Sequence, residues 1–577
     1  MLIRLLRQYL APYRREIGAV VVAQVIATVA MLYLPTLNAD IIDEGVARGD
    51  TDLILHLGMW MLLFSVVQVV GSIASSWFGA RAALGAGRDM RTDLMRRVGS
   101  FSTREVGTFG APSLITRTTN DVQQVQLLGV MAATILVTAP IMCIGGVVMG
   151  VRVGSSLAWV LVVAVPLLGG AMALIIGRMI PQFRVMQTRI DAVNRVLREQ
   201  ITGIRVVRAF VREDHERTRF GVANDDLTTA SLRVGRLVAL MFPTVLLITN
   251  VTMVAIVWVG GYRISAGAVE VGALTAMISY VMQILMAVMM ASFLAMMAPR
   301  ASVCAERIGE VLSTDSSVVP TTTPVGFAGD PGVVEFRDAQ FRHPGADEPV
   351  LCDITLTARP GTTTAIVGST GAGKTTLLSL IPRLIDATEG SVSVGGTDVR
   401  DLDLELLRGA IGVVPQKPYL FSGTIRSNLL YGRADATDEE IWDALRIAQA
   451  EDFVRDMPDG LDTAVSQGGT TVSGGQRQRL AIARAVIRRP SILLFDDSFS
   501  ALDLATDARL RAALRPGTRE ACVIVVAQRV STIVEADQIV VLEHGRTVGI
   551  GTHDELLRSC STYAEIVDSQ MAVQGAR

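Results

Sequence analysis

Residues 368–376, GSTGAGKTT, have the residue types and the spacing of a phosphate-binding loop. They match the pattern of glycine, four residues, glycine, lysine and serine or threonine, after a predicted strand and before a predicted helix. Glycines let backbone N–H groups wrap around phosphate oxygens, and the helix N-terminus adds a favourable partial charge. We expect Lys374 to reach the terminal phosphates and Thr375 to ligate Mg²⁺. The other candidate binding residues of the loop are Gly368, Ser369, Thr370, Gly371, Ala372, Gly373 and Thr376.

Two consecutive carboxylates, Asp496 and Asp497, follow the apolar run ILLF farther along the chain. An apolar strand that ends in aspartate is the usual second half of a phosphate-binding-loop site, where Asp496 would polarise the water shell of the metal. A chance match in a glycine-rich chain is the alternative for the loop alone, and the downstream strand argues against it. The two motifs together predict binding of a nucleoside triphosphate with Mg²⁺.

These motifs require an α/β domain, and the second half of the chain has the pattern of one. Short β-branched runs alternate with helical segments, which predicts a largely parallel sheet. A stretch rich in Ser, Thr, Pro and Gly, residues 313–332, has the composition of a linker. We therefore predict a domain at 1–312, the linker at 313–332 and the α/β domain at 333–577.

The first domain is predicted to be an α-helical membrane domain, because half of the chain is apolar and six stretches are long enough to cross ~30 Å of hydrocarbon. Long arginine-rich segments follow the second and fourth stretches, so the positive-inside rule places both termini and these two predicted loops in the cytoplasm. The first stretch could instead be a signal peptide, but it lacks an obvious cleavage site and follows an amphipathic segment. The six stretches lie near 17–39, 54–79, 128–151, 155–180, 237–261 and 272–297.

Charge and cysteine content exclude several classes of protein. The formal net charge of −2 gives no reason to expect a nucleic-acid partner. The five cysteines are scattered, with neither metal-ligand spacing nor the clustering of a disulfide scaffold, so we expect reduced packing residues.

Residues between and after the two nucleotide motifs resemble the ATP-binding cassette (ABC) family in order and spacing. They are VVPQKPYLFSGTIRSNL (413–429) and TTVSGGQRQRLAIARA (470–485). The resemblance implies that Gln416 links the metal and the attacking water to the membrane domain, that Asp503 belongs to the D-loop, and that the cofactors are ATP and Mg²⁺. It also implies that a signature sequence presents donors to the γ-phosphate held by an opposite cassette: Val472, Ser473, Gly474, Gly475 and Gln476.

Six spans before one cassette resemble a half-transporter of the exporter fold, so the resemblance covers essentially the whole chain. Residues 114–122 and 197–210 resemble the stretches that flank or form the coupling helices of this family. Without that resemblance, the arginine-rich segments would be only solvated surfaces.

Three positions depart from the family pattern. Asp497 stands where the family usually has the glutamate that deprotonates the attacking water, and it is shorter by one methylene, roughly 1.5 Å. Gln528 replaces the switch histidine, and an amide can neither become cationic nor relay a proton. His343 replaces the aromatic residue expected to stack on adenine. Taking Asp497 and Gln528 as independent changes, we expect this site to bind ATP and to hydrolyse it slowly.

A slow site beside an intact signature favours a heterodimer, in which this chain completes the competent site of a second half-transporter. The chain resembles the degenerate-site chain of heterodimeric multidrug or lipid exporters of actinobacteria. It implies ATP-driven export of a small hydrophobic, amphipathic or lipid-like substrate across the bacterial inner membrane, with contact to membrane lipid. An exporter-fold importer, and an ATP-gated regulatory subunit or channel, are the alternatives.

The sequence does not identify the cargo. Methionines recur at helical spacing in the sixth stretch, which could line an adaptable apolar pathway or could serve helix packing. They are Met282, Met286, Met289, Met290 and Met297.

Overall fold

The computed structural model describes residues 1–500 and 502–575. Tertiary contacts divide the chain into two compact units. The first unit holds residues 1–99 and 110–314, and the second holds residues 100–109 and the chain from 315 onward. The short segment 100–109, which lies within the predicted membrane domain in sequence, therefore belongs with the α/β unit in space.

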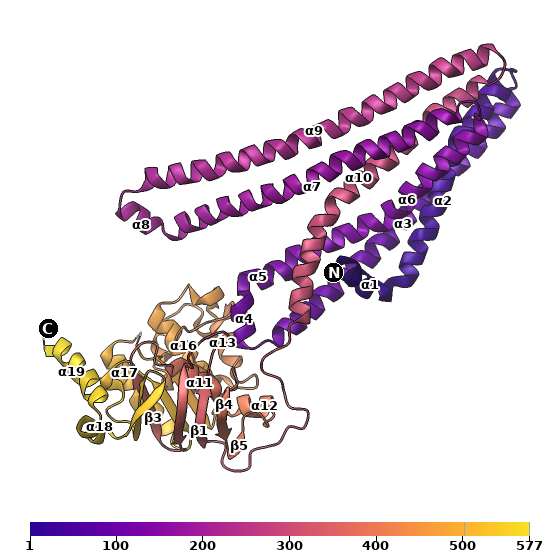
Figure 1. Cartoon of the computed structure of the whole chain (residues 1–577). Helices are drawn as coiled ribbons and strands as arrows, with labels where there is room; N and C mark the ends of the chain where they lie inside the picture. The colour runs from indigo at the N-terminus through magenta and orange to yellow at the C-terminus, as the bar shows by residue number, and fades with distance from the viewer. Residues whose placement is uncertain (501, 576–577) are drawn as a thin grey trace. The chain divides into compact units, whose positions relative to one another are not determined.

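The first unit is helical, and within the described residues six helical stretches are long and apolar enough to cross a membrane (Figure 1). This confirms the predicted α-helical membrane domain with six spans. Within this unit, α7 and α9 lie side by side, with the short helix α8 at their tip (Figure 1). The helices from the N-terminus to the second unit, α4 of segment 100–109 included, are α1 (Leu2–Leu10), α2 (Arg14–Asp40), α3 (Thr51–Gly99), α4 (Thr103–Phe109), α5 (Ala111–Thr116), α6 (Val122–Val153), α7 (Ala158–Thr202), α8 (Ile204–Ala209), α9 (Glu213–Ser265) and α10 (Val271–Ser313).

Several of these helices are longer than a membrane is thick. Helix α3 has 49 residues, about 70 Å at 1.5 Å per residue, against ~30 Å of hydrocarbon. The prediction of long cytoplasmic loops after the second and fourth spans is wrong in form, because α3 and α7 continue as helix to Gly99 and Thr202. These segments are rich in Arg, Leu, Ala and Met, which favour helix in water as well as in lipid.

Small residues let the first two long helices approach closely. A side chain at Gly71 of α3 would come within 2.9 Å of the Ala23 carbonyl oxygen and 3.0 Å of the Ala27 Cβ on α2. Packing of small residues is the usual means of helix association where lipid removes the hydrophobic driving force. Other small residues on the buried side of α3 continue this stripe: Ser75, Gly79, Ala82, Ala83 and Ala86.

Two ion pairs join the helical segment at residues 117–121 to the end of α10 within the first unit. Arg117 lies 2.7 Å from Glu310, and Arg307 lies 3.3 Å from Asp121. Arg117 and Asp121 are buried, and a buried charge is tolerated only when it is paired. The pairs therefore fix the turn within residues 114–122 to the last span.

The second unit contains a six-stranded sheet in the order β12-β11-β3-β10-β9-β6 and a four-stranded antiparallel sheet in the order β2-β1-β4-β5. A short pair of strands, β7 and β8, accompanies them. The strands are β1 (Val334–Phe341), β2 (Leu351–Ala358), β3 (Thr363–Gly368), β4 (Glu389–Val394), β5 (Thr397–Asp398), β6 (Ile411–Val414), β7 (Gly423–Thr424), β8 (Ala464–Val465), β9 (Ile492–Asp496), β10 (Cys522–Val526), β11 (Gln538–Glu543) and β12 (Arg546–Gly551).

Helices cover the large sheet and complete the predicted α/β class. They are α11 (Lys374–Leu380), α12 (Leu404–Gly409), α13 (Ile425–Leu430), α14 (Asp438–Ile447), α15 (Glu451–Arg455), α16 (Gly474–Val486), α17 (Leu504–Gly517), α18 (His553–Ser559) and α19 (Ser561–Gly575).

Strands β6, β9, β10, β3 and β11 pair in parallel and are buried on both faces. In β9, Leu493 and Phe495 point into one apolar core, whereas Ile492 and Leu494 point into the other. Burial on both faces explains why the sequence of this strand is a continuous apolar run rather than an alternating one. The carboxyl ends of parallel strands meet at one edge of the sheet, so residues that follow them are brought together.

Candidate nucleotide site

The residues predicted from distant parts of the sequence meet at this edge of the sheet. The phosphate-binding loop follows β3, Gln416 follows β6, the two carboxylates end or follow β9, and Gln528 follows β10. The register places Val526 of β10 beside Asp496 of β9 and beside Ile366 of β3. The sheet therefore fixes the spacing between the loop and the carboxylates.

Two glycines give the phosphate-binding loop its shape. Gly371 and Gly373 have φ angles of 87° and 91°, a conformation that other residues avoid. A Cβ at Gly373 would also lie 2.7 Å from the Leu351 side chain and 3.0 Å from the Val350 carbonyl oxygen. Glycine is therefore required at Gly373 for two reasons, and α11 begins immediately after it.

Polar groups of the loop and of β9 form one connected cluster. Lys374 Nζ donates hydrogen bonds to the carbonyl oxygens of Gly368 at 2.8 Å and Ser369 at 2.7 Å. The Thr375 hydroxyl donates to Asp496 Oδ1 at 3.0 Å. The ammonium, the hydroxyl and the carboxylate thus converge on the start of α11, as the motif predicts.

Burial shifts the protonation of two groups in this cluster. Burial lowers the pKa of Lys374, against the opposing influence of Asp497 and Asp496. Burial also raises the pKa of Asp496; the nearby charge of Asp497 adds to this effect, whereas Thr375 and Lys374 oppose it. Both groups carry a desolvation cost that a bound metal and phosphate charge would offset.

Asp497 lies at the centre of a second set of contacts. Its Oδ2 atom accepts a hydrogen bond from Gln528 Nε2 at 2.9 Å and a longer one from Gln416 Nε2 at 3.4 Å. Its backbone adopts a φ of 47°, and its N–H donates to the Val526 carbonyl oxygen at 3.0 Å. A left-handed backbone and two amide donors together fix the direction of the short carboxylate.

These contacts change how the two departures from the family pattern are read. From the sequence, Asp497 and Gln528 are interpreted as independent changes. In the structure, a direct hydrogen bond joins the two side chains. An amide at position 528 can hold a carboxylate at this distance without changing charge. The sequence carries no signal of this contact, because it depends on the neighbouring positions of β9 and β10 in the sheet.

The signature residues form a separate local structure on α16. Ser473 is the N-cap; its hydroxyl accepts from the Gln476 N–H at 3.2 Å, and Gln476 Oε1 accepts from the Ser473 N–H at 2.9 Å. This reciprocal pair is a capping box, which satisfies the free donors of the first helical turn. Val472 is buried, Ser473 and Gly474 are exposed, and Gly475 and Gln476 are partly exposed. The signature is therefore available to a group outside the chain.

The last two predicted binding residues are exposed. His343 packs its ring against the edge of Phe341, with centroids 4.9 Å apart. Asp503 caps α17 by accepting a hydrogen bond from the Thr506 N–H at 2.9 Å, and the bond from this N–H lowers the pKa of Asp503. Within the described residues, no hydrogen bond joins either side chain to the group formed by Lys374, Thr375 and Asp496.

The arrangement suits a nucleoside triphosphate with Mg²⁺. The loop wraps ahead of α11 through glycines with positive φ, and α11 begins directly after Gly373. The Thr375 hydroxyl and the Asp496 carboxylate are hard oxygen donors of the kind that Mg²⁺ prefers, and they would hold the ion or its water shell beside the phosphates. Within the described residues no cluster of three or more His, Cys, Asp and Glu side chains offers another metal site.

Comparison with known families agrees with this geometry. Residues 17–288 match the family described as ABC transporter transmembrane region, and residues 351–500 match the family described as ABC transporter. An uncharacterized ABC transporter ATP-binding protein of Mycobacterium tuberculosis (strain CDC 1551 / Oshkosh) is 53% identical over 574 residues, which covers 99% of this chain and 98% of that protein.

A more distant relative and a solved structure extend the comparison. A multidrug efflux ATP-binding/permease protein of Mycobacterium bovis (strain BCG / Pasteur 1173P2) is 33% identical over 568 residues, 97% of this chain and 46% of that protein. A bacterial Atm1-family ABC exporter, solved with ATP bound, superposes with a TM-score of 0.81 at 24% identity over 96% of this chain and 99% of that one. The fold is therefore that of the exporter.

Proposed function

Because the chain belongs to the ABC transporter family and has the exporter fold of six spans and one cassette, we propose that it is one half of a heterodimeric exporter whose own ATP site is degenerate. Membership of the family makes it a multi-pass membrane protein and an ATPase coupled to transport, with ATP and Mg²⁺ as cofactors. The heterodimer, the degenerate site and the cargo are our proposal.

The contacts of Asp497 carry the argument for a degenerate site. A general base must reach the attacking water, and Asp497 is roughly 1.5 Å shorter than glutamate. Its Oδ2 atom already accepts from Gln528 and Gln416, which hold the carboxylate in place. General-base catalysis contributes about 10²–10⁴-fold, so a base that is too short and held in this position leaves a site that binds ATP and turns it over slowly.

Exposed apolar surface supports assembly with a second half-transporter. Helix α8 and its flanks leave large apolar side chains exposed, with Phe210 73% and Val211 82% accessible. On the cassette, Tyr419, Phe421 and Tyr431 form an exposed aromatic cluster, in which Phe421 and Tyr431 stack with centroids 4.7 Å apart. We propose that α8 of each chain docks on the aromatic cluster of the other cassette.

The choice of a heterodimer follows from the contrast between the two halves of the cassette. Ser473 and Gln476 keep an ordered capping box at the surface, whereas the base and the switch position of the same chain are altered. Two cassettes closed head to tail place each signature over the ATP of the other chain. A homodimer would therefore contain two slow sites, whereas a heterodimer contains one slow and one competent site.

Features of the membrane domain support a hydrophobic or amphipathic drug or lipid as cargo. A cavity of about 850 Å³ lies among α6, α7 and α10 with an almost wholly apolar lining, a volume suited to a drug-sized ligand. On α10, Met282 is 50% exposed and Met286 is 58% exposed, whereas Met289 and Met290 pack against neighbouring helices. The name of the multidrug efflux relative agrees with this class of cargo.

We further propose that the transporter lies in the bacterial inner membrane with both termini and the cassette in the cytoplasm, where ATP is available. The arginine-rich ends of α3 and α7 support this orientation.

Purification of the native complex tests the proposal. We expect a second, different half-transporter to co-purify and the complex to hydrolyse ATP, while this chain alone binds ATP with negligible turnover. Vesicles of defined sidedness should accumulate an amphipathic dye only when ATP reaches the cassette side. Robust turnover by the pure chain would contradict the degenerate site, and dye movement toward the cassette side would indicate an importer instead.

A further inference from the structure

The polypeptide crosses between the two units three times, at 99/100, 109/110 and 314/315. The segment 100–109 follows α3 and leads into α5, and the linker 315–332 follows α10. Both the segment and the linker belong to the second unit together with the cassette. All covalent routes by which the cassette can act on the membrane helices of its own chain therefore begin in these two stretches.

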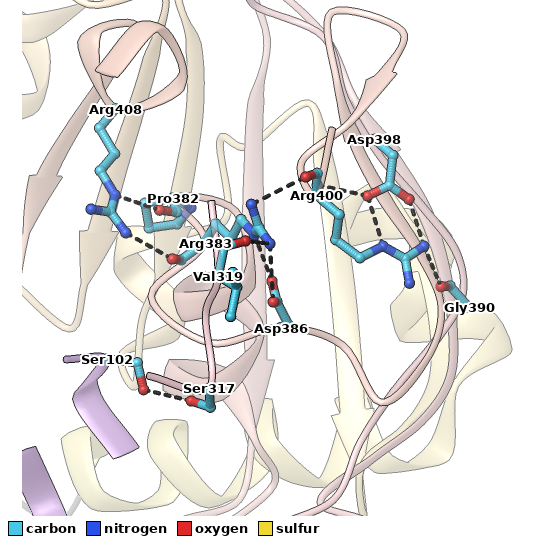
Figure 2. Close-up of polar contacts among 10 residues, drawn as sticks. All are labelled: Ser102, Ser317, Val319, Pro382, Arg383, Asp386, Gly390, Asp398, Arg400 and Arg408. Carbon is cyan, nitrogen blue, oxygen red and sulfur yellow. Dashed lines mark hydrogen bonds and ion pairs between the residues drawn. The ribbon is translucent and has the colours of Figure 1, made fainter. Parts of the chain in front are cut away.

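A buried carboxylate ties the two stretches together. Glu105 Oε2 accepts from the Ser102 hydroxyl at 2.6 Å, from the Ser102 N–H at 3.0 Å and from the Ser317 hydroxyl at 3.3 Å. The Ser102 and Ser317 hydroxyls also bond each other at 2.8 Å (Figure 2). Glu105 is only 7% exposed and Ser102 is buried, so truncating Glu105 would leave the buried Ser102 N–H without its acceptor. We call this set of contacts the Glu105 clasp.

A buried guanidinium holds the linker two residues farther on. Arg383 is 4% exposed and is neutralised by Asp386, which accepts from Nε at 2.8 Å and from Nη2 at 3.2 Å. The same side chain donates to the Val319 carbonyl oxygen at 3.0 Å and to the Arg400 carbonyl oxygen at 3.2 Å (Figure 2). The ion pair serves the stability of the cassette, and the bond to Val319 fixes the linker to it.

The position of Arg383 is itself braced from two sides. Arg408 donates to the carbonyl oxygens of Pro382 at 3.1 Å and Arg383 at 2.9 Å, and Arg400 pairs with Asp398 (Figure 2). Farther along, Val325 forms a parallel bridge with Leu402. The linker is therefore attached at Ser317, Val319 and Val325, although its composition resembles that of a free tether.

The spacing of these attachments determines how much slack separates α10 from the cassette. With the clasp closed, only residues 314–316 lie between the end of α10 and the first attachment, so the four steps from Ser313 to Ser317 reach at most about 14 Å. With both the clasp and the Val319 bond broken, about ten residues become a flexible chain with an end-to-end distance of roughly 17 Å. A flexible linker of that length lets the cassette move by several ångströms without moving α10, whereas an attached linker transmits the movement to α10.

We propose that Glu105 and Arg383 are positioning residues for energy coupling, which make the linker and the segment 100–109 move as one body with the cassette. A movement of the cassette then reaches α3, α5 and α10 at the same time. The clasp stays closed throughout the transport cycle. This role does not depend on whether the partner chain is identical or different.

The test measures coupling separately from hydrolysis, in the transporter purified with its partner and placed in proteoliposomes. The five native cysteines are first replaced, and Met286→Cys on α10 reports ATP-dependent movement of the membrane domain through its rate of alkylation by N-ethylmaleimide. We expect Glu105→Ala and Ser317→Ala to keep ATPase rates within about twofold but to reduce the ATP-dependent change in alkylation at least about fivefold. Arg383→Lys should do the same, because lysine lacks the planar fork that pairs with Asp386 and Val319 together.

Ser316→Ala is the matched control, because the neighbouring Ser316 hydroxyl is buried and has no hydrogen-bond partner in the described structure. It should behave like the parent. A reversible cross-link separates coupling from folding: Ser102→Cys with Ser317→Cys in the Glu105→Ala background should restore the alkylation response when oxidised and lose it when reduced.

Two results would overturn the inference: equal responses in the parent and Glu105→Ala, or an oxidised cross-link that leaves the response absent. If the parent itself shows no ATP-dependent change in alkylation, then ATP does not move the membrane domain. The inference would then be wrong as well.

Discussion

Asp497 and Gln528 act as a pair in this structure, because the amide of one holds the carboxylate of the other at 2.9 Å. A longer base at position 497 would meet the Gln528 amide, and a histidine at position 528 would leave the short carboxylate with one donor fewer. Residues in direct contact give non-additive effects when both are changed. The two departures from the family pattern should therefore be reversed together.

We predict that Asp497→Glu with Gln528→His raises ATP hydrolysis at this site by about 10²-fold, since restoration of a positioned general base contributes 10²–10⁴-fold. Each single change should give less than about a tenfold gain, because the unchanged partner still disturbs the base. The rates are measured in the heterodimer after inactivation of the other site. Additive single effects would contradict the coupling of the two residues.

The two halves of the cassette should also respond unequally to mutation. Ser473→Arg places a bulky side chain where the signature meets the partner's γ-phosphate, so heterodimer ATPase should fall by at least about 10²-fold. Lys374→Ala weakens ATP binding at the slow site but leaves the competent site intact, so ATPase should fall less than about tenfold. Both rates are measured side by side at saturating ATP. The reverse order would exchange our assignment of the slow and fast sites.

At the level of elements, the segment 100–109 and the linker are short pieces of chain whose placement depends on a few polar contacts. The Glu105 carboxylate is buried, which raises its pKa, but hydrogen bonds from Ser102 and Ser317 outweigh burial and lower the pKa of Glu105 below its ordinary 4.5. These influences are hydroxyl and backbone groups rather than charges. The ionised form is therefore the one that holds the clasp together.

This shift predicts a pH dependence with a defined sign. A carboxylate whose pKa is lower in the folded state stabilises that state fully above pH 4.5 and loses its contribution as the pH falls through the folded pKa. We expect Glu105→Gln to flatten the acid side of the stability profile as the pH falls below 4.5. Thermal unfolding of the transporter across this range measures it, with Ser316→Ala as the unchanged control. Parallel profiles for Glu105→Gln and the parent would contradict the assigned charge.

Helix α8 gives the second prediction at this scale. If Phe210 is buried against a partner cassette, Phe210→Asp removes roughly 1.5–3 kcal/mol of apolar burial and should weaken assembly about 10–100-fold. Phe210→Leu keeps most of the apolar area and should assemble nearly normally. Co-purification with the second half-transporter at decreasing concentration measures the difference. Equal recovery of both variants would remove α8 from the proposed interface.

At the scale of the whole molecule, the proposed transporter needs a second chain. Ser473 and Gly474 of the signature are exposed at the start of α16, the nucleotide cluster lies at the edge of the six-stranded sheet, and within the described residues no hydrogen bond joins the two. An ATP site that needs both must draw one of them from a second chain. The exposed apolar ends of α8 point to the same requirement.

We therefore predict that the isolated chain binds ATP, with Lys374→Ala reducing the affinity by at least about tenfold through loss of a charge-assisted contact to phosphate. Its turnover should remain negligible until the partner chain is added. Binding of a fluorescent ATP analogue and release of phosphate, measured on the same preparation, separate the two properties. Turnover by the isolated chain at the rate of the complex would contradict the proposal.

The sequence alone determined the fold class and the chemistry of the nucleotide site. Apolar stretches longer than a bilayer specify spans through local composition, and the phosphate-binding loop is contiguous in sequence, so Gly373, Lys374 and Thr375 were identifiable without a structure. The carboxylates of β9 followed from a continuous apolar run, because a parallel strand buried on both faces has that pattern. These properties depend on residues close together in the chain.

Only the tertiary structure decided which distant residues touch. Gln528 and Asp497 lie 31 positions apart, and Glu105 and Ser317 lie 212 apart, so neither pair leaves a periodic or local trace in the sequence. The same limit explains the two arginine-rich segments, which the sequence suggested as loops and the structure forms as helix. In a sequence, a charged helix that extends into water has the same composition as a charged loop. The apolar pattern that marks a span ends where the membrane ends, although the helical hydrogen bonds of the backbone continue.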